Sequence, residues 1–129
     1  MLTWNGRYDC NGTAAQSWIV SGGKVQVAGT NFCLDAGSGT SPSSPCPFFS
    51  PITHNSLSAD AAPANGIPLK IWTCYDNLPA QSWTYTSSSQ LELATGDLCV
   101  DLTNGSVADG NVVQTWACVA GNANQVWTE

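Results

Sequence analysis

The chain is 129 residues long, which suffices for one domain with its own core and is too short for two ordinary domains. Only 9% of its residues are charged, against about 25% in typical soluble domains, and this neutral polar composition favours an uncharged ligand. The net charge of -6 would repel phosphate backbones and anionic lipids, so nucleic acid and membrane surfaces are poor partners. No apolar run approaches the roughly 18 residues of a membrane span, and membrane insertion is not expected.

The cysteines indicate the compartment. Six cysteines in so small a chain favour disulfides and an oxidising, extracellular environment. There is no Cys-x-x-Cys and only one histidine, His54, so neither a metal site nor a cofactor is expected. Residues 1–4 lack the basic start and apolar core of a signal peptide. If the protein is secreted, its signal lies upstream of this chain or has been removed.

Short strands are predicted along the whole chain. Residues 19–27 alternate between apolar and polar side chains around a Gly-Gly turn, and residues 84–93 do the same around three serines. No segment of eleven or more residues has apolar positions at helical spacing, which predicts an all-β fold. Residues 37–64 hold five of the seven prolines and do not alternate, so we expect an irregular insertion there. It is either a binding loop or an artefact of the gene model.

Three tripeptide motifs recur and define an internal repeat. A Gln-x-Trp motif ends at Trp18, Trp83 and Trp127, and a Cys-x-Asp motif ends at Asp35 and Asp101. A Trp-x-Cys motif ends at Cys74 and Cys118. The chain therefore divides into a partial repeat one, a repeat two with the insertion, and a repeat three, over residues 1–18, 19–83 and 84–129. Repeat one lacks its Cys-x-Asp half.

Corresponding cysteines predict two disulfides, Cys33–Cys74 and Cys99–Cys118, and leave Cys10 and Cys46 without repeat partners. If the bridged cysteines lie opposite each other on antiparallel strands, Asp101 should face Trp116, and Asp35 should face Trp72. A carboxylate accepts sugar hydroxyls, and an indole covers the apolar face of a sugar ring, which is continuous in galactose. The tryptophans of Gln-x-Trp are predicted to be scaffold, with each glutamine bonding local backbone.

The motifs resemble those of the ricin-B-type lectin family, a β-trefoil of three sugar-binding repeats, over nearly the whole chain. The resemblance implies a sugar-binding set in repeat three, with Gln125 behind it as support; its members are Asp101, Gln114, Trp116 and Asn124. Repeat two keeps Asp35 and Trp72 but has Lys70 in place of the glutamine and Ala80 in place of the asparagine. Its site should therefore be weaker or altered in preference, and repeat one should have none.

The expected function is non-catalytic binding of galactose-type glycans or polysaccharide, by a secreted lectin or by the binding module of a larger glycosidase. One alternative is a protein-binding or protease-inhibitor trefoil that works through residues 37–64. A glycoside hydrolase is less favoured, because no paired carboxylates are apparent. The truncated repeat one predicts an open barrel that exposes the apolar flank of Trp18 and Ile19. A missing upstream segment, a homodimer or the insertion could cover that flank, and the first is favoured.

Overall fold

The computed structural model describes residues 2–3, 6–7, 12, 14–37 and 63–128. Cys10, Cys46, His54 and most of the 37–64 insertion lie outside this part of the chain.

The described residues form eleven β-strands and four short 3₁₀ helices, and they contain no α-helix, which confirms the all-β prediction. The strands are β1 (Leu2–Thr3), β2 (Gly6–Arg7), β3 (Trp18–Ser21), β4 (Lys24–Val27), β5 (Phe32–Asp35), β6 (Ile67–Pro68), β7 (Lys70–Thr73), β8 (Trp83–Tyr85), β9 (Leu91–Leu93), β10 (Leu98–Leu102) and β11 (Val113–Ala117). The 3₁₀ helices are η1 (Ala14–Gln16), η2 (Pro79–Gln81), η3 (Thr103–Gly105) and η4 (Ala123–Gln125).

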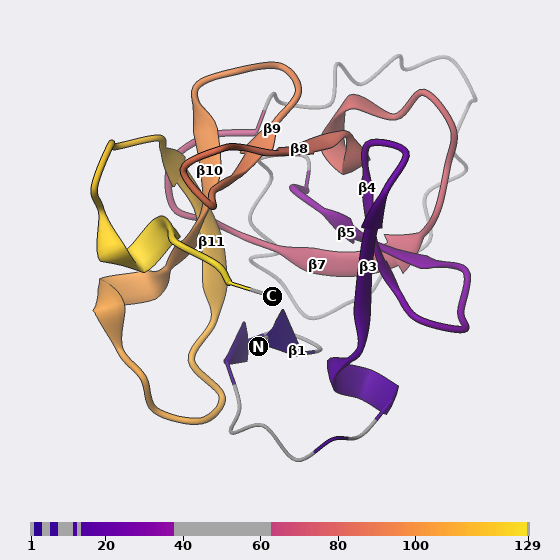
Figure 1. Cartoon of the computed structure of the whole chain (residues 1–129), viewed down its shortest axis with the longest axis horizontal. Helices are drawn as coiled ribbons and strands as arrows, with labels where there is room; N and C mark the ends of the chain where they lie inside the picture. The colour runs from indigo at the N-terminus through magenta and orange to yellow at the C-terminus, as the bar shows by residue number, and fades with distance from the viewer. Residues whose placement is uncertain (1, 4–5, 8–11, 13, 38–62, 129) are drawn as a thin grey trace, which may run out of the picture.

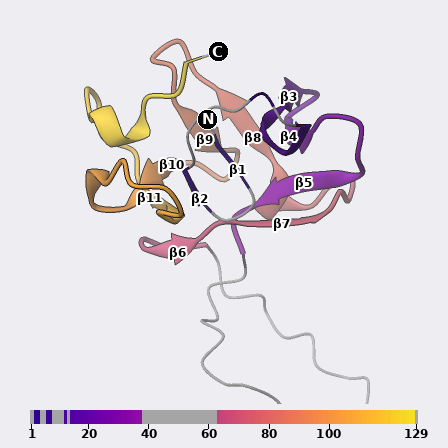
Figure 2. The same cartoon turned by 90° about the horizontal axis from the view of Figure 1, so that it is seen from below.

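Repeats two and three have the same topology. Repeat two forms a four-stranded antiparallel sheet in the order β3-β4-β5-β7. Repeat three forms the matching order β8-β9-β10-β11, and β6 adds to its edge beside β11. The short β1-β2 hairpin lies between these two sheets in both views (Figures 1 and 2). The sequence repeat is thus also a repeat in structure.

The two predicted hairpins are present. In the first, β3 and β4 are joined by Gly22 and Gly23, whose φ angles of 59° and 75° suit a tight turn that matches the strand twist. In the second, β8 pairs with β9 across a longer turn in which Ser89 has a φ of 58°. Each hairpin begins at the tryptophan that ends a Gln-x-Trp motif.

The core lies between the repeats and is built from alternate residues of the strands. Trp83 is 2% exposed and is the largest side chain that is fully buried among the described residues. Its indole Nε1 donates to the carbonyl oxygen of Leu34 at 3.0 Å, in the middle of the Cys-x-Asp motif of repeat two. Trp127 repeats this bond to Val100 O, also at 3.0 Å. Trp83 and Trp127 are therefore scaffold, as predicted, and each anchors the carboxylate-bearing strand of its own repeat.

An open, largely apolar cavity of about 660 Å³ lies beside β3. Trp18 and Ile19 line it from one side and Trp127 from another. Ile19 is 50% exposed and Val20 39% exposed, so the expected apolar flank is present. Its closure by an upstream segment, a second copy or the insertion stays a prediction.

The structure contains the disulfides Cys33–Cys74 and Cys99–Cys118, each with a Cα–Cα distance of 5.0 Å. The predicted strand register was nevertheless wrong by two residues. Asp101 lies opposite Gln114, and Trp116 lies opposite Cys99. The reason is that Cys118 follows the end of β11 and its N–H donates to Asp97 O, so the disulfide joins diagonal positions.

Repeat two shows the same correction. Asp35 lies opposite Lys70, and Trp72 lies opposite Cys33, whereas the prediction placed Asp35 opposite Trp72. The N–H of Cys74 donates to Asn31 O, the counterpart of the Cys118 bond. The shared offset means that the residue facing each aspartate is the one two positions before the tryptophan.

Replacing Cys99 and Cys118 together with alanine should lower the free energy of unfolding by about 3 kcal/mol. The disulfide closes a loop with a sequence separation of 19 residues, and opening it restores conformational entropy to the unfolded chain. Urea unfolding of the variant and the wild type measures the difference. Peptide mapping should recover Cys99 joined to Cys118, and a bond from Cys99 to Cys33 would contradict the repeat assignment.

Candidate functional site

Asp101 lies at the centre of the candidate site in repeat three. It sits on β10 and is only 5% exposed. Its Oδ1 accepts a hydrogen bond from Gln114 Nε2 at 3.0 Å, and its Oδ2 accepts one from Gln125 Nε2 at 3.2 Å. A carboxylate has about four acceptor positions, so these two bonds fix its orientation and leave acceptor capacity for ligand hydroxyls.

Gln125 supports Asp101 from behind and is completely buried. Its Nε2 also donates to Ala117 O at 2.9 Å, and its Oε1 accepts from Val119 N at 2.9 Å and from Gln90 Nε2 at 3.1 Å. Both amide hydrogens and both acceptor positions are therefore used within the protein. Gln125 therefore orients the carboxylate and has no donor left for a ligand, and its role as support of a sugar site stays a prediction.

Gln114 and Trp116 share one face of β11, because side chains two residues apart on a strand point the same way. Gln114 meets Asp101 directly, whereas Trp116 is diagonal to it. The Trp116 side chain is 42% exposed, unlike the buried Trp83. The structure thus combines a buried acceptor with a solvent-accessible aromatic surface on one face.

The returning end of the insertion borders this face. Gly66 donates its N–H to Thr115 O at 2.7 Å, and a Cβ at Gly66 would lie 3.6 Å from a Trp116 ring carbon and 4.0 Å from Gln114 Oε1. Asn65 Oδ1 accepts from Ala117 N at 2.6 Å. No sequence pattern connected these residues with repeat three, although Asn65-Gly66 is a turn signal.

Asn124 occupies a different position from the rest of the predicted set. Its N–H donates to Asn122 Oδ1 at 3.0 Å. Its side-chain amide lies against Gly105, where an added Cβ would be 2.9 Å from Asn124 Oδ1. Asn124 also lines the apolar cavity. The structure therefore places Gln114 and Gln125 in hydrogen-bond contact with Asp101 and places Asn124 beside η3.

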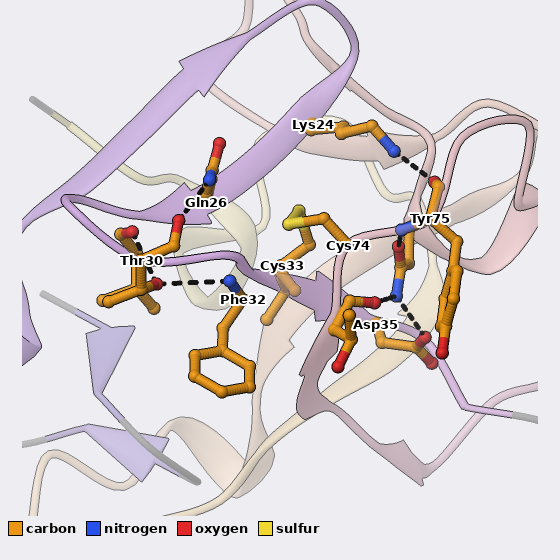
Figure 3. The surroundings of a disulfide bond; sticks show 12 residues. Lys24, Gln26, Thr30, Phe32, Cys33, Asp35, Cys74 and Tyr75 are labelled. Carbon is orange, nitrogen blue, oxygen red and sulfur yellow. Dashed lines mark hydrogen bonds between the residues drawn. A yellow bond between two sulfur atoms is a disulfide. The ribbon is translucent and has the colours of Figure 1, made fainter.

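Repeat two reproduces the support of the carboxylate. Asp35 is 3% exposed, and its Oδ2 accepts from Gln81 Nε2 at 3.0 Å. Gln81 Nε2 also donates to Thr73 O, and its Oε1 accepts from Tyr75 N, each at 2.9 Å. These contacts match those of Gln125 one repeat later. Figure 3 shows Asp35 and Tyr75 on the same side of the Cys33–Cys74 bond.

Gln90 is a supporting residue that the sequence analysis missed. Besides its bond to Gln125, its Nε2 donates to Val119 O at 3.2 Å. Its counterpart in repeat two is Lys24, which donates to Tyr75 O (Figure 3). The lysine and glutamine look unrelated in sequence, so only the matched hairpin registers reveal that they are equivalent.

Replacing Gln90 with alanine should lower the free energy of unfolding by about 1–2 kcal/mol, because Gln125 Oε1 and Val119 O each lose a donor. Gln90→Lys should recover part of this loss, since a lysine makes the equivalent contact in repeat two. Thermal melting of both variants measures the effect. Equal destabilisation by alanine and lysine would contradict the equivalence.

Residues 48–129, more than half of the chain, match the family model described as the ricin-type beta-trefoil lectin domain. The chain belongs to this family. No curated protein matches it. The fold is a β-trefoil, with two complete four-stranded repeats among the described residues.

Family membership identifies carbohydrate as the ligand, since this domain is in general a non-catalytic carbohydrate-binding module. Within the residues that the structure describes, no three metal-ligating side chains gather in one place. None of the described helices is both long enough and apolar enough to cross a bilayer.

Proposed function

We propose that the protein binds galactose-type sugars, free or in a polysaccharide, through Asp101, Gln114 and Trp116 of repeat three. The observation that carries the proposal is that Asp101 and Trp116 differ in how far they are buried. The carboxylate is almost fully buried and held by two amide donors, whereas the indole is 42% exposed. A protein that needed Trp116 only for packing would bury it, as it buries Trp83.

The chemistry of this face suits a neutral sugar. Asp101 accepts two hydroxyl groups, Gln114 adds an amide beside it, and the Trp116 ring contacts the apolar C–H face. Galactose presents a continuous C–H face because its 4-hydroxyl is axial. Asn124 remains the fourth predicted member of the set, although its side chain lies against Gly105, and Gln125 is the support. Binding needs no cofactor, and the site offers no pair of carboxylates for hydrolysis.

Repeat two forms the weaker site, with Asp35, Lys70 and Trp72, and repeat one forms none. The whole chain, residues 1–129, is one domain of three repeats with an insertion at 37–64. Disulfides and family membership are typical of extracellular proteins, which favours secretion. Nucleic acid is no partner, because the chain is strongly acidic.

A glycan array on the purified chain tests the proposal. Galactose-terminated glycans or galactose polymers should give the strongest signals, and free galactose should compete. An Asp101→Ala variant on the same array is the control, because it keeps every other surface. Binding confined to glycans without galactose-type residues would overturn the sugar preference, and no glycan binding at all would overturn the function.

Two assays address the rival functions. No hydrolysis of aryl glycosides is expected, whereas turnover would favour a glycoside hydrolase. A protein-binding or protease-inhibitor trefoil would keep its activity in Asp101→Ala, because it would work through one exposed loop and would not need the carboxylate. Protease inhibition that survives this substitution would favour that alternative.

A further inference from the structure

The candidate site of repeat two differs from that of repeat three in one charge. Lys70 faces Asp35 on β7 in the same register in which Gln114 faces Asp101 on β11. Trp72 follows two residues later and is 53% exposed, as Trp116 follows Gln114. Where repeat three has the neutral amide of Gln114, repeat two has the ammonium group of Lys70, and the strand register around the two residues is the same.

The ammonium group lies where a neutral sugar would sit. Lys70 Nζ is 3.8 Å from Asp35 Oδ1 and 4.9 Å from the centre of the Trp72 ring. It therefore occupies the space between the carboxylate and the aromatic face. A neutral galactoside that used both groups would have to displace it, and would give up the cation–π contact in doing so.

The ammonium group of Lys70 has donor hydrogens that no described residue accepts. Asp35 is already held by Gly37 N at 2.7 Å and by Gln81 Nε2 at 3.0 Å, so it does not depend on the lysine. In the described part of the chain, no acceptor lies within hydrogen-bond distance of Lys70 Nζ, and the Lys70 side chain is 44% exposed. An ammonium group has three donor hydrogens, and a ligand can reach them here.

The charge distribution separates the two repeats. The chain has three basic residues, and two of them, Lys24 and Lys70, belong to repeat two, whereas repeat three has none. The ammonium group of Lys24 already has partners within the protein, because it donates to Tyr75 O and lies 3.9 Å from Asp76 Oδ1. The accessible positive charge of repeat two is therefore that of Lys70.

We propose that repeat two binds an acidic sugar, a hexose that carries a carboxylate, with Lys70 as the residue that receives the anion. This inference rests on the proposed function, because it assigns a ligand class to the second site of the same lectin. The sugar carboxylate pairs with Lys70 Nζ and offsets the loss of its cation–π contact, so that the Trp72 ring is free to contact the sugar beside the half-exposed Tyr75. Asp35 accepts a hydroxyl.

Calorimetric titration with methyl galacturonide and methyl galactoside tests the inference. The background is Asp101→Ala, which removes the repeat-three site. In this background galacturonide should still bind, and its affinity should fall as salt is raised, since the contact is ionic. Lys70→Gln should weaken galacturonide binding by about tenfold or more, because one charge-assisted contact is lost. Lys70→Gln should also allow the neutral galactoside to bind, since it places a glutamine opposite Asp35 as Gln114 lies opposite Asp101.

Arg7→Gln is the matched control. It changes the net charge by the same amount, but Arg7 lies on β2 in repeat one, outside the repeat-two site, so galacturonide affinity should stay within about twofold. Lys70→Met, which removes the ammonium group and keeps an unbranched side chain of nearly the same length, is a second variant in case the glutamine variant misfolds, and it should lose galacturonide binding equally. An absence of galacturonide binding, or equal binding by wild type and Lys70→Gln, would overturn the inference. Galactoside binding that depends on Asp101 would still support the proposed function in that case, whereas loss of both would refute both.

Discussion

Replacing Asp101 with alanine should lower the affinity for galactose-type sugars by about a hundredfold or more. The carboxylate supplies the buried acceptors of the proposed repeat-three site, and each hydrogen bond to a charged group contributes about 1.5–3 kcal/mol. Two such bonds are lost together. Isothermal titration with methyl galactoside measures the change directly.

The fold should survive this substitution well enough for the measurement. Gln125 keeps its bond to Ala117 O and its two acceptor contacts, so only one of its four hydrogen bonds is lost. The matched control is Asp35→Ala, which removes the equivalent carboxylate of repeat two and disturbs Gln81 in the same way. Loss of galactoside binding in Asp35→Ala, with binding retained in Asp101→Ala, would show that repeat two is the principal site.

Replacing Trp83 with alanine should lower the free energy of unfolding by about 3–5 kcal/mol, since the substitution leaves a large cavity in the core. The indole is 2% exposed and its Nε1 bond to Leu34 O is lost as well. Such a loss is a large part of the roughly 5–15 kcal/mol that stabilises a small domain. Thermal and urea unfolding should both show it.

Trp116→Ala is the matched control for Trp83→Ala, because it removes the same side chain from an exposed position. It should change the free energy of unfolding by about 1 kcal/mol or less and yet weaken galactoside binding. The two substitutions thus distinguish a tryptophan that stabilises the fold, Trp83, from one that is expected to bind the sugar, Trp116. A large loss of stability in Trp116→Ala, without a loss of binding, would show that Trp116 is part of the core.

The repeat motifs predicted the elements that depend on local chemistry. The Gln-x-Trp closures place Trp83 in the core and Gln81 against backbone, as expected from their recurrence. The hairpins follow from alternation around turn residues. Because Cys-x-Asp recurs with its partner cysteine, the two disulfides could also be inferred before the structure was known.

Register and distant neighbours could not be inferred in this way. A disulfide fixes which strands are adjacent but tolerates a diagonal offset, so the assumption that Cys99 and Cys118 are opposite placed Asp101 two residues from its true partner. The contact between Gly66 and Trp116 depends on where the insertion returns to the sheet, which no local pattern encodes. The position of Asn124 beside Gly105 likewise depends on how η3 and η4 meet in space.

The most direct test of the central claim is an NMR titration of nitrogen-labelled protein with methyl galactoside, followed through the indole N–H signals of the six tryptophans and the side-chain amides. The account predicts that Trp116 and the Gln114 amide shift with one common dissociation constant, while the indole of Trp83, bonded to Leu34 O, stays unchanged. Shifts confined to Trp18 and Trp127, which line the apolar cavity, would contradict a sugar site at Asp101.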